Sequence, residues 1–463
     1  MTKNILIITF DQCRADWLNV YKQKTSIPNI NKLAKNSLIA NNCYSPSPHC
    51  VPTRFSWLTG MSPCELGVTK NVGISITEKA ETIFKKKKME NIYVSLIGKT
   101  HWTSHFKEGD LRNNKKLLNH LGFEDVQEIA GPRALQRITC DLTDEWEKRG
   151  YLEKYKQDIK RRYKSKNPKE AWACRSSVLP NSLYPDLWIT EKAIKKIMEL
   201  PEKNRWILWV SYVGPHEPFD TPEPWSSNKD IYLGDEIKEK PKWISDLSGC
   251  ELERTNNKWS GKLSEKEIYA IRGDYASKIE MLDDCVGKLV EHIEMRTDSS
   301  ETEIVITSDH GEHLGDYGFL YKGSFLESSV KVPFIYRPCE NQRYKTTKFL
   351  NSYIDSTLLL KKIVGNQKTK HRVRKSELTQ EFGVVSSFGD ENMYIQDGVK
   401  IVLNKEGEII WGNDLKSTGE KDNIMKDLQS SGNRRYELAV EWAKDQFMER
   451  EKLLGCKTWF DPD

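Results

Sequence analysis

The chain has 463 residues, a length that accommodates one large α/β domain together with a smaller one. Its 72 Lys and Arg residues barely exceed its 67 Asp and Glu residues, whereas a nucleic-acid-binding protein would show a concentrated basic face. The ten cysteines form no C-x-x-C pair, no apolar run is long enough to span a bilayer, and the first residues enter a strand pattern directly. These features argue against nucleic-acid and membrane partners and predict a reducing, cytoplasmic setting.

The N-terminal part of the chain alternates buried strands with helices. The strand Ile5 to Phe10 is a continuous apolar run, which is typical of a parallel sheet covered on both faces. Pro52 is preorganised for a first helical turn, so a helix is predicted over Val51 to Thr59, with Cys50 just before its start. Further helices are predicted over Pro28 to Ala34, Thr77 to Lys88, Leu142 to Lys164, Asp186 to Leu200 and Ser264 to Met295, and further strands over Tyr93 to Ile97, Trp206 to Val213 and Glu303 to Thr307.

This alternation predicts an α/β fold, a doubly wound, mixed but mainly parallel sheet flanked by helices. The polar segment Thr221 to Gly261 has no clean period and is interpreted as an insertion near the mouth of the site. After Pro338 the pattern changes to a smaller C-terminal α+β subdomain, which divides the chain into residues 1–370 and 371–463. The elements predicted after Pro338 are a helix over Ser352 to Val364, short strands over Glu381 to Ser386, Met393 to Ile395, Lys400 to Asn404 and Glu408 to Trp411, and a last helix over Arg434 to Leu454.

Polar residues that can carry chemistry follow four predicted strands at the point where each strand ends. The carboxyl ends of strands form the edge at which ligands bind in open α/β sheets. A single Asp or a single Pro-His pair after a strand is more often structural than functional, but repeated placement at one edge indicates a site. The residues concerned are Asp11 and Gln12, then Lys99 and His101, then His216, and finally Asp309 and His310.

Cys50 lies at the predicted start of the Val51 to Thr59 helix, beside unpaired backbone N–H groups and the positive end of the helix dipole. Such a helix start favours an anionic substrate. Arg54, one turn further along, is expected to point back toward the same end. Cys50 is therefore a candidate nucleophile with a permanent positive charge beside it.

The strand-end residues also predict a metal site. Asp11 and Asp309 offer carboxylate oxygens, which suit Ca²⁺, Mg²⁺ or Mn²⁺, while Gln12 can add an amide oxygen and His310 a nitrogen. A thiolate at Cys50 would be a poor ligand for such a cation, and an oxygen-bearing group at that position would be a good one. The metal site thus favours a modified form of Cys50.

These motifs resemble those of a known family in their order along the chain, over about Ile5 to Arg337. Cys50-x-Pro52-Thr53-Arg54 followed by Thr59-Gly60 resembles the type I sulfatase signature of the alkaline-phosphatase superfamily. The other matching segments are Asp11-Gln12, Gly98-Lys99-Thr100-His101, Gly214-Pro215-His216-x-Pro218, Ser308-Asp309-His310-Gly311 and Lys322-Gly323. The resemblance implies that a formylglycine-generating enzyme oxidises Cys50 to formylglycine, whose hydrated aldehyde is the nucleophile.

The resemblance also implies a role for each site residue. One divalent cation, Ca²⁺ in the first place with Mn²⁺ or Mg²⁺ as alternatives, is held by Asp11, Gln12, the modified Cys50, Asp309 and His310. Arg54 and Lys99 hold the formylglycine and the sulfate. His216 and Lys322 neutralise the bridging oxygen, with His216 preferred as the acid, and His101 removes the proton that regenerates the aldehyde.

The main prediction is a sulfuric ester hydrolase acting on a small sulfated sugar, aryl sulfate or alkyl sulfate. The alternative is a phosphonate or phosphate mono- or diesterase, because Gln12 replaces the second Asp of the family pattern, as in phosphonate monoester hydrolases and choline-sulfatase-like enzymes. Lys99 and His101 match sulfatases and favour the first. A third possibility, an inactive relative that binds anionic sugars, is disfavoured because every site residue is present.

Two sets of residues have both a structural and a functional interpretation. Asn71 either contacts the substrate or caps a loop. The Trp102 loop and the Trp, Lys and Arg side chains of the Thr221 to Gly261 segment either line a subsite for a carbohydrate or aryl group or pack as ordinary core and surface.

Overall fold

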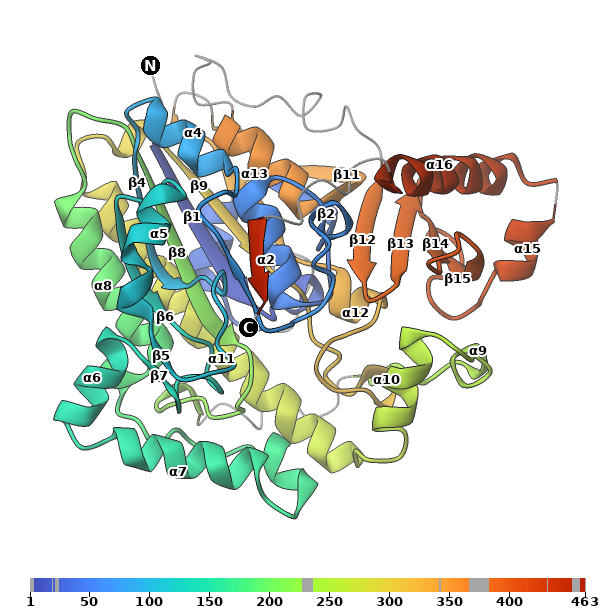
Figure 1. Ribbon diagram of the computed structural model, residues 1–463, viewed down its shortest axis with the longest axis horizontal. Coiled ribbons are helices and arrows are strands. Elements are labelled where there is room, and N and C mark those ends of the chain that lie inside the picture. Colours follow the sequence, from blue (N-terminus) through green and yellow to red (C-terminus); the bar gives the residue numbers. More distant parts are fainter. Residues whose placement is uncertain are drawn as a thin grey trace.

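An eight-stranded sheet forms the centre of the protein (Figure 1). The computed structural model describes residues 4–18, 20, 25–226, 236–340, 343–365, 383–430, 432–451 and 459–462. Among these described strands of the sheet, β10 alone runs antiparallel to its neighbours, so the predicted mainly parallel sheet is confirmed. The spatial order is β11 (Lys348–Asp355), β2 (Leu38–Tyr44), β10 (Phe334–Arg337), β9 (Thr302–Ser308), β1 (Asn4–Asp11), β8 (Trp206–Pro215), β4 (Tyr93–Lys99) and β6 (Asp125–Ile129).

The central strands are buried along their whole length because helices cover both faces of the sheet. Every residue of β1, β8 and β9 is buried. Ile8 of β1 pairs with Val210 on one side and Ile306 on the other. This register keeps the carboxyl ends of the three strands level, which brings the residues that follow them to one place.

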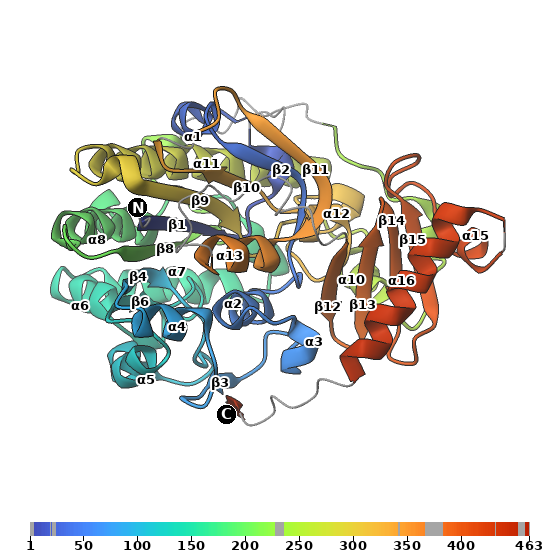
Figure 2. The ribbon, with the colours of Figure 1, turned by 90° about the horizontal axis from the view of Figure 1, so that it is seen from above.

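Figure 2 shows the two helical layers. One contains α1 (Pro28–Ala34), α8 (Pro185–Glu199) and α11 (Glu265–Glu294), and the other contains α2 (Cys50–Thr59), α4 (Ile83–Met89) and α13 (Ser356–Gly365). The long helix α11 begins with a capping box between Ser264 and Glu267. Its apolar stripe is buried against the sheet and α8, as the sequence predicts.

A four-stranded antiparallel sheet forms the smaller C-terminal part: β12 (Val384–Phe388), β13 (Glu391–Gln396), β14 (Val399–Leu403) and β15 (Ile409–Asp414). Helix α16 (Arg434–Glu451) packs on β13 and β14 over a separate small core, and α15 (Met425–Gln429) packs on β15. The predicted α+β subdomain is confirmed. The boundary placed between residues 370 and 371 lies outside the described residues.

Several element boundaries differ from the predicted ones. Helix α4 begins only at Ile83, because the Thr82 hydroxyl caps it by accepting a hydrogen bond from Lys85 N. The predicted helix over Leu142 to Lys164 divides into α6 (Asp141–Lys148) and α7 (Leu152–Tyr163) around Gly150, whose φ of 75° interrupts the helix.

The C-terminal region differs too. Ser352 to Asp355 extend strand β11, which pairs with β2, and α13 begins only at Ser356. The helix α16 is not the last element, because β16 (Phe460–Pro462) follows it and pairs with β3 (Ile74–Ile76) of the large domain. The remaining short elements are α3 (Pro63–Leu66), β5 (Gly109–Asp110), α5 (Lys115–His120), β7 (Ile138–Thr139), α9 (Lys242–Ser245), α10 (Glu251–Trp259) and α12 (Glu327–Val330).

The cysteines of the described part of the chain form no disulfide. Within the same ranges, no helix combines the length and the apolar character that a bilayer-spanning segment requires.

Candidate active site

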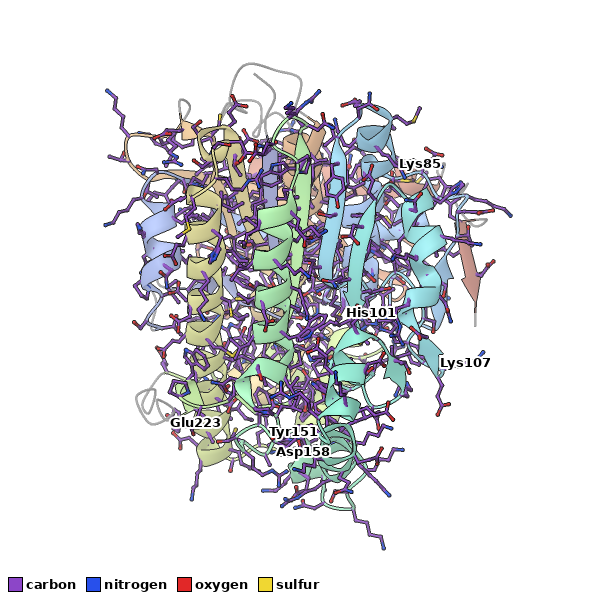
Figure 3. All side chains as sticks on the ribbon, turned by 90° about the vertical axis from the view of Figure 1, so that its left-hand side faces the viewer. Lys85, His101, Lys107, Tyr151, Asp158 and Glu223 are labelled. Atoms are coloured by element: carbon purple, nitrogen blue, oxygen red, sulfur yellow. The ribbon has the colours of Figure 1, made fainter. Side chains whose placement is uncertain are left out.

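Four strand ends and one helix start converge at the carboxyl edge of the large sheet. Figure 3 labels His101 below Lys85 of α4, on the side of the sheet where β4 ends. The residues that the fold places here are Asp11 at the end of β1, Lys99 at the end of β4, His216 directly after β8, Asp309 directly after β9, and Cys50 as the first residue of α2. The predicted convergence of the strand ends is therefore confirmed.

Backbone hydrogen bonds connect these strand ends to one another. The N–H of His216 donates to the carbonyl of Asp11 over 3.1 Å, and the N–H of Asp309 donates to the carbonyl of Phe10 over 3.2 Å. Gln12 has a φ of 71°, and its N–H donates to Asp309 Oδ1 over 3.0 Å. Because these bonds fix the backbone, the functional side chains begin from rigid positions.

The start of α2 is capped from another part of the chain. The side chain of His49, the residue before the helix, makes no capping hydrogen bond, and Asn71 Oδ1 instead accepts a hydrogen bond of 2.9 Å from Val51 N. Asn71 thus caps the helix, and its Nδ2 also lies 3.9 Å from Cys50 Sγ. At the other end, Gly60 closes the helix in the left-handed conformation with a φ of 76°.

Asp11, Cys50, Asp309 and His310 form a buried cluster in which one ligand atom from each lies within 4.8 Å of the others. The ring Nδ1 of His310 is 2.9 Å from the carbonyl of Gly311, and its Nε2 lies 3.1 Å from Cys50 Sγ. Because the carbonyl requires a donor at Nδ1, Nε2 presents its lone pair to the cluster. Two carboxylates and an imidazole are a donor set that fits a hard divalent cation, whereas the Cys50 thiol does not.

Two cations balance the carboxylates of this cluster. Arg54 Nε donates to Asp309 Oδ2 over 2.8 Å, and Arg54 Nη2 lies 3.5 Å from Asp11 Oδ2. Arg54 Nη1 is fixed by the carbonyl of Lys99 at 2.6 Å and the hydroxyl of Ser211 at 2.8 Å. Lys99 Nζ forms an ion pair with Asp11. All four charged groups are buried, so each depends on its partners for stability.

Lys322 approaches Cys50 from the connection between β9 and α12. Its Nζ lies 3.2 Å from Cys50 Sγ and donates to Gln12 Oε1 over 2.9 Å. Gln12 Nε2 in turn donates to Glu217 Oε2 over 2.9 Å and to the carboxyl of Glu312. The amide of Gln12 is therefore oriented by three neighbours, and its oxygen accepts the hydrogen bond from Lys322.

The cations around Cys50 determine the ionisation of its thiol. Burial and Asp11 would raise the pKa of Cys50, but the ammonium groups of Lys322 and Lys99 oppose them, and the pKa of the thiol lies well below its ordinary value. Burial opposes the charge of Lys322 as well, yet Cys50 and Asp11 raise the pKa of its ammonium group above the ordinary range. The site thus stabilises negative charge at position 50.

His216 lies at the edge of the cluster and is paired with the next residue. Its Nδ1 lies 2.7 Å from the carbonyl of Glu217 and 3.1 Å from Glu217 Oε2. Burial lowers the pKa of His216 to about 4, with Lys322 adding to the shift, although Glu217 opposes it. Burial would raise the pKa of Glu217, but Arg133 and His216 lower it to about 2. His216 is accordingly neutral at neutral pH.

His101 also lies at the site, but it has no hydrogen bond to the cluster among the described residues. Its ring stacks on that of His105 with centroids 5.0 Å apart, and its Nδ1 has no described partner. Burial and Lys99 hold the pKa of His101 well below its ordinary value. The neighbouring Trp102 is part of the core and donates to the carbonyl of Arg54 over 3.1 Å, so its interpretation as ordinary packing is correct.

Sequence reasoning missed three charged residues at this site. Glu217 and Glu312 orient the Gln12 amide, and both could have been noticed because each lies inside a motif, next to His216 in one case and after Asp309-His310-Gly311 in the other. Arg133, which forms an ion pair with Glu217, follows β6 in a segment without any recognised motif. Nothing in the sequence pattern indicated its position.

Glu128 supports the loop that carries Lys99 and His101. Its buried carboxyl accepts hydrogen bonds from the Thr100 hydroxyl and, over 3.4 Å, from Asn114 Nδ2. Burial raises the pKa of Glu128 from 4.5 to about 7. A raised pKa means that the folded state prefers the protonated carboxyl. The stability it contributes is present below pH 4.5 and is lost as the pH rises through 7.

A Glu128→Gln variant should therefore gain stability only at high pH. Because Gln has no charge to bury, we expect its free energy of unfolding to exceed that of the wild type by about 2 kcal/mol at pH 8. The difference should vanish near pH 4.5. Urea unfolding followed by circular dichroism between pH 4.5 and 8 measures it, and a pH-independent difference would contradict the assigned pKa.

Comparisons with known proteins agree with this arrangement. The family model described as Sulfatase matches residues 3–358. An arylsulfatase of Clostridium perfringens is 26% identical over 368 residues, which are 77% of this chain and 73% of that protein. A choline-sulfatase of Rhizobium meliloti is 26% identical over 349 residues, which are 72% of this chain and 62% of that protein.

A solved structure shows the same fold. The phosphonate monoester hydrolase SpPMH from Silicibacter pomeroyi superposes with a TM-score of 0.73 over 100% of this chain and 99% of that one, at 16% sequence identity. The two structures share both the large sheet and the smaller C-terminal part, since nearly all of each chain is aligned. Because the family model spans the large domain and its motifs meet at one sheet edge, this chain belongs to the sulfatase family.

Proposed function

We propose that this sulfatase hydrolyses the sulfate ester of a small sugar, phenol or alkyl alcohol, using formylglycine at position 50 and one divalent cation. The observation that carries the proposal is the place of Cys50. Its Sγ lies in a cluster with two carboxylates and an imidazole, 3.2 Å from the Lys322 ammonium. A formylglycine-generating enzyme is the partner that such a cysteine requires for maturation.

Asp11, Asp309, His310 and the modified residue 50 would hold the cation, which when bound stabilises negative charge on oxygen. The oxygen-rich donor set favours Ca²⁺, with Mn²⁺ or Mg²⁺ as alternatives. Gln12 Oε1 accepts a hydrogen bond from Lys322 in this structure, so it can serve as a ligand only by sharing that oxygen.

Formylglycine supplies a hydrated aldehyde oxygen as the nucleophile, and the cations of the chain position it. Lys99 and Arg54 flank Asp11, and Lys322 approaches position 50 from the other side. Lys99 and Arg54 pair with Asp11 and Asp309, whereas the Lys322 ammonium faces position 50 directly. The sulfate group is thus held by fixed charges that need no rearrangement when negative charge builds up on its oxygens.

The leaving oxygen requires a proton, and Lys322 is the residue that carries one. The Lys322 ammonium is charged at neutral pH and its Nζ lies 3.2 Å from Cys50 Sγ, whereas burial lowers the pKa of His216 to about 4. We therefore assign the donation at the leaving oxygen to Lys322 Nζ, in place of the acid role that the sequence-based interpretation preferred for His216. Neutral His216 donates from Nδ1 to the Glu217 carbonyl, so its Nε2 can accept a hydrogen bond from the departing alcohol.

His101 is suited to the opposite role. Its low pKa keeps the imidazole neutral, so it can accept a proton when the aldehyde is regenerated. The stack on His105 fixes the plane of its ring. Each proton transfer thus has a residue in the protonation state that the step requires.

A phosphonate or phosphate ester hydrolase is the second candidate, and one observation favours it. Gln12 stands where the family pattern has a second Asp, which removes one negative charge beside the cation, and its amide is oriented by Glu217 and Glu312. A weaker negative field at this position would favour the dianionic phosphate monoester, whereas a phosphonate monoester carries the same single charge as a sulfate ester.

Parallel assays on matched esters decide between the two candidates. We expect kcat/KM for 4-nitrophenyl sulfate to exceed that for 4-nitrophenyl phenylphosphonate by about tenfold or more, equivalent to about 1.4 kcal/mol of transition-state preference. The leaving group is the same in both substrates, so the ratio reports on the transferred group. A preference for the phosphonate would replace the sulfatase proposal with the second candidate.

A further inference from the structure

Aromatic and cationic side chains gather beside Lys322, outside the residues that contact Cys50. The Arg133 guanidinium lies 4.1 Å from the ring centroid of Tyr163 and 5.3 Å from that of Tyr321. The Trp259 ring packs edge-on against Tyr321 with centroids 5.4 Å apart, and Lys258 Nζ lies 5.2 Å from the Trp259 centroid. We call Arg133, Tyr163, Lys258, Trp259 and Tyr321 the outer cluster.

Four separate segments supply the outer cluster. Arg133 lies in the connection between β6 and β7, Tyr163 ends α7, Lys258 and Trp259 end α10, and Tyr321 precedes Lys322. Helix α10 belongs to the Thr221 to Gly261 segment that the sequence places near the mouth of the site. The fold therefore brings the Thr221 to Gly261 segment next to the loop that carries Tyr321 and Lys322.

The outer cluster joins the active site on the side of the leaving group. Arg133 forms an ion pair with Glu217, whose other carboxylate oxygen accepts a hydrogen bond from Gln12. Glu217 also contacts His216, and Tyr321 is followed directly by Lys322. Lys322 and His216 are the two residues assigned to the leaving oxygen, so a group attached to that oxygen extends toward the outer cluster.

The outer cluster carries positive charge that the protein does not balance. Lys258 is solvent-exposed, and among the residues described by the structure no carboxylate forms an ion pair with it. Partial burial, together with the positive charges of Arg133 and Lys262, holds the pKa of Lys258 below its ordinary value. Glu217 neutralises Arg133 but is shared with Gln12 and His216. An anion between Arg133 and Lys258 would relieve this repulsion.

Building on the sulfatase function proposed above, we propose that the outer cluster binds a second anionic group, carried by the leaving alcohol of the substrate. The half-buried rings of Tyr321 and Tyr163 provide apolar and cation–π surface for a sugar or aryl ring, while Trp259, which is only 4% exposed, supports Tyr321 from the core. The Arg133 fork and the Lys258 ammonium pair with a carboxylate or a second sulfate. The substrate class is thus a sulfate ester of an acidic sugar or an acidic phenol.

The test uses two esters of nearly equal size that differ in the charge of the leaving alcohol: 4-(carboxymethyl)phenyl sulfate and its primary amide. Their leaving groups are closely similar, so the ratio of their kcat/KM values isolates the second anion. We expect the wild type to prefer the acid by about tenfold, a gain of the size expected for one charge-assisted hydrogen bond. In Lys258→Met the ratio should fall to about one, and Arg133→Gln should lower it as well.

Lys266→Met is the matched control, since it removes the same charge from an exposed position on α11. It should keep the preference of the wild type. If Lys258→Met lowers kcat/KM for both esters by the same factor, the residue is structural and the second-anion subsite is overturned. A wild type that shows no preference for the acid overturns it equally.

A binding measurement separates this inference from the proposed chemistry. Calorimetric titration of the Cys50→Ala variant with each intact ester measures the Kd of that ester in the absence of turnover. Tighter binding of the acid, lost in the Cys50→Ala, Lys258→Met double variant, supports the subsite even if the wild type hydrolyses neither ester, in which case the sulfatase proposal alone fails. Equal binding of acid and amide overturns the subsite even where both esters are hydrolysed.

Discussion

The Cys50→Ala variant is expected to lose sulfate ester hydrolysis, with kcat at least about 10⁴-fold below the wild type. Alanine removes the sulfur atom of residue 50 that faces Asp11, Asp309 and His310, so neither a thiol nor an aldehyde derived from it can form. Lys322, Arg54 and Lys99 remain, and they can still hold a sulfate group. We therefore expect the loss in kcat with little change in the Kd of the intact ester.

Initial-rate kinetics with 4-nitrophenyl sulfate, together with calorimetric binding, checks this prediction. Cys64→Ala is the matched control, because Cys64 is also buried but belongs to α3 outside the cluster. Its kcat should stay within about twofold of the wild type, since α3 contributes no residue to the cluster. Retained turnover in Cys50→Ala would refute the assignment of residue 50 as the nucleophile.

Asp309→Asn should lose both the divalent cation and about 10³-fold in kcat. Asp309 contributes one of the two carboxylates of the cluster, and it also pairs with Arg54 Nε over 2.8 Å. The amide keeps the size of the side chain and an oxygen that can accept the hydrogen bond from Gln12 N. It removes the charge that a hard cation requires.

Metal content by mass spectrometry and kcat are measured on the same preparations of this variant. Wild-type protein treated with a chelator should lose activity in parallel, and adding back Ca²⁺, Mn²⁺ or Mg²⁺ separately identifies the effective ion. Thermal melting detects misfolding caused by the unpaired Arg54. A chelated wild type that keeps full activity, with no bound metal, would contradict the proposed cation site.

The main features of the fold could be predicted from the sequence because their signals are local. The apolar runs of β1, β8 and β9 reflect burial on both faces, and the residues after them meet because parallel strands share one carboxyl edge. For the same reason the amino-acid pattern alone places Asp11, Lys99 and Asp309 together, and the ion pairs of Asp11 with Lys99 and of Asp309 with Arg54 agree with that placement. The helix beside Cys50 could be predicted from Pro52, although α2 begins at Cys50 itself, one residue before the predicted start at Val51.

The parts that the sequence did not predict depend on contacts between distant segments. The strand β16 exists only because it pairs with β3, and Ser352 to Asp355 are a strand only because β2 lies beside them. The protonation state of His216 depends on its burial and on the charges of Glu217 and Lys322, which residue spacing alone does not give. Arg133 reaches Glu217 from a segment that carries no motif.

The most direct test of the proposed chemistry is the mass of the tryptic peptide that contains Cys50, from protein co-expressed with a formylglycine-generating enzyme. Conversion of the thiol to the aldehyde lowers that mass by about 18 Da, a value that follows from the chemistry of the modification. We expect the specific activity toward 4-nitrophenyl sulfate to rise in proportion to the converted fraction. Full sulfatase activity in protein whose Cys50 peptide has the unmodified mass would contradict the formylglycine mechanism.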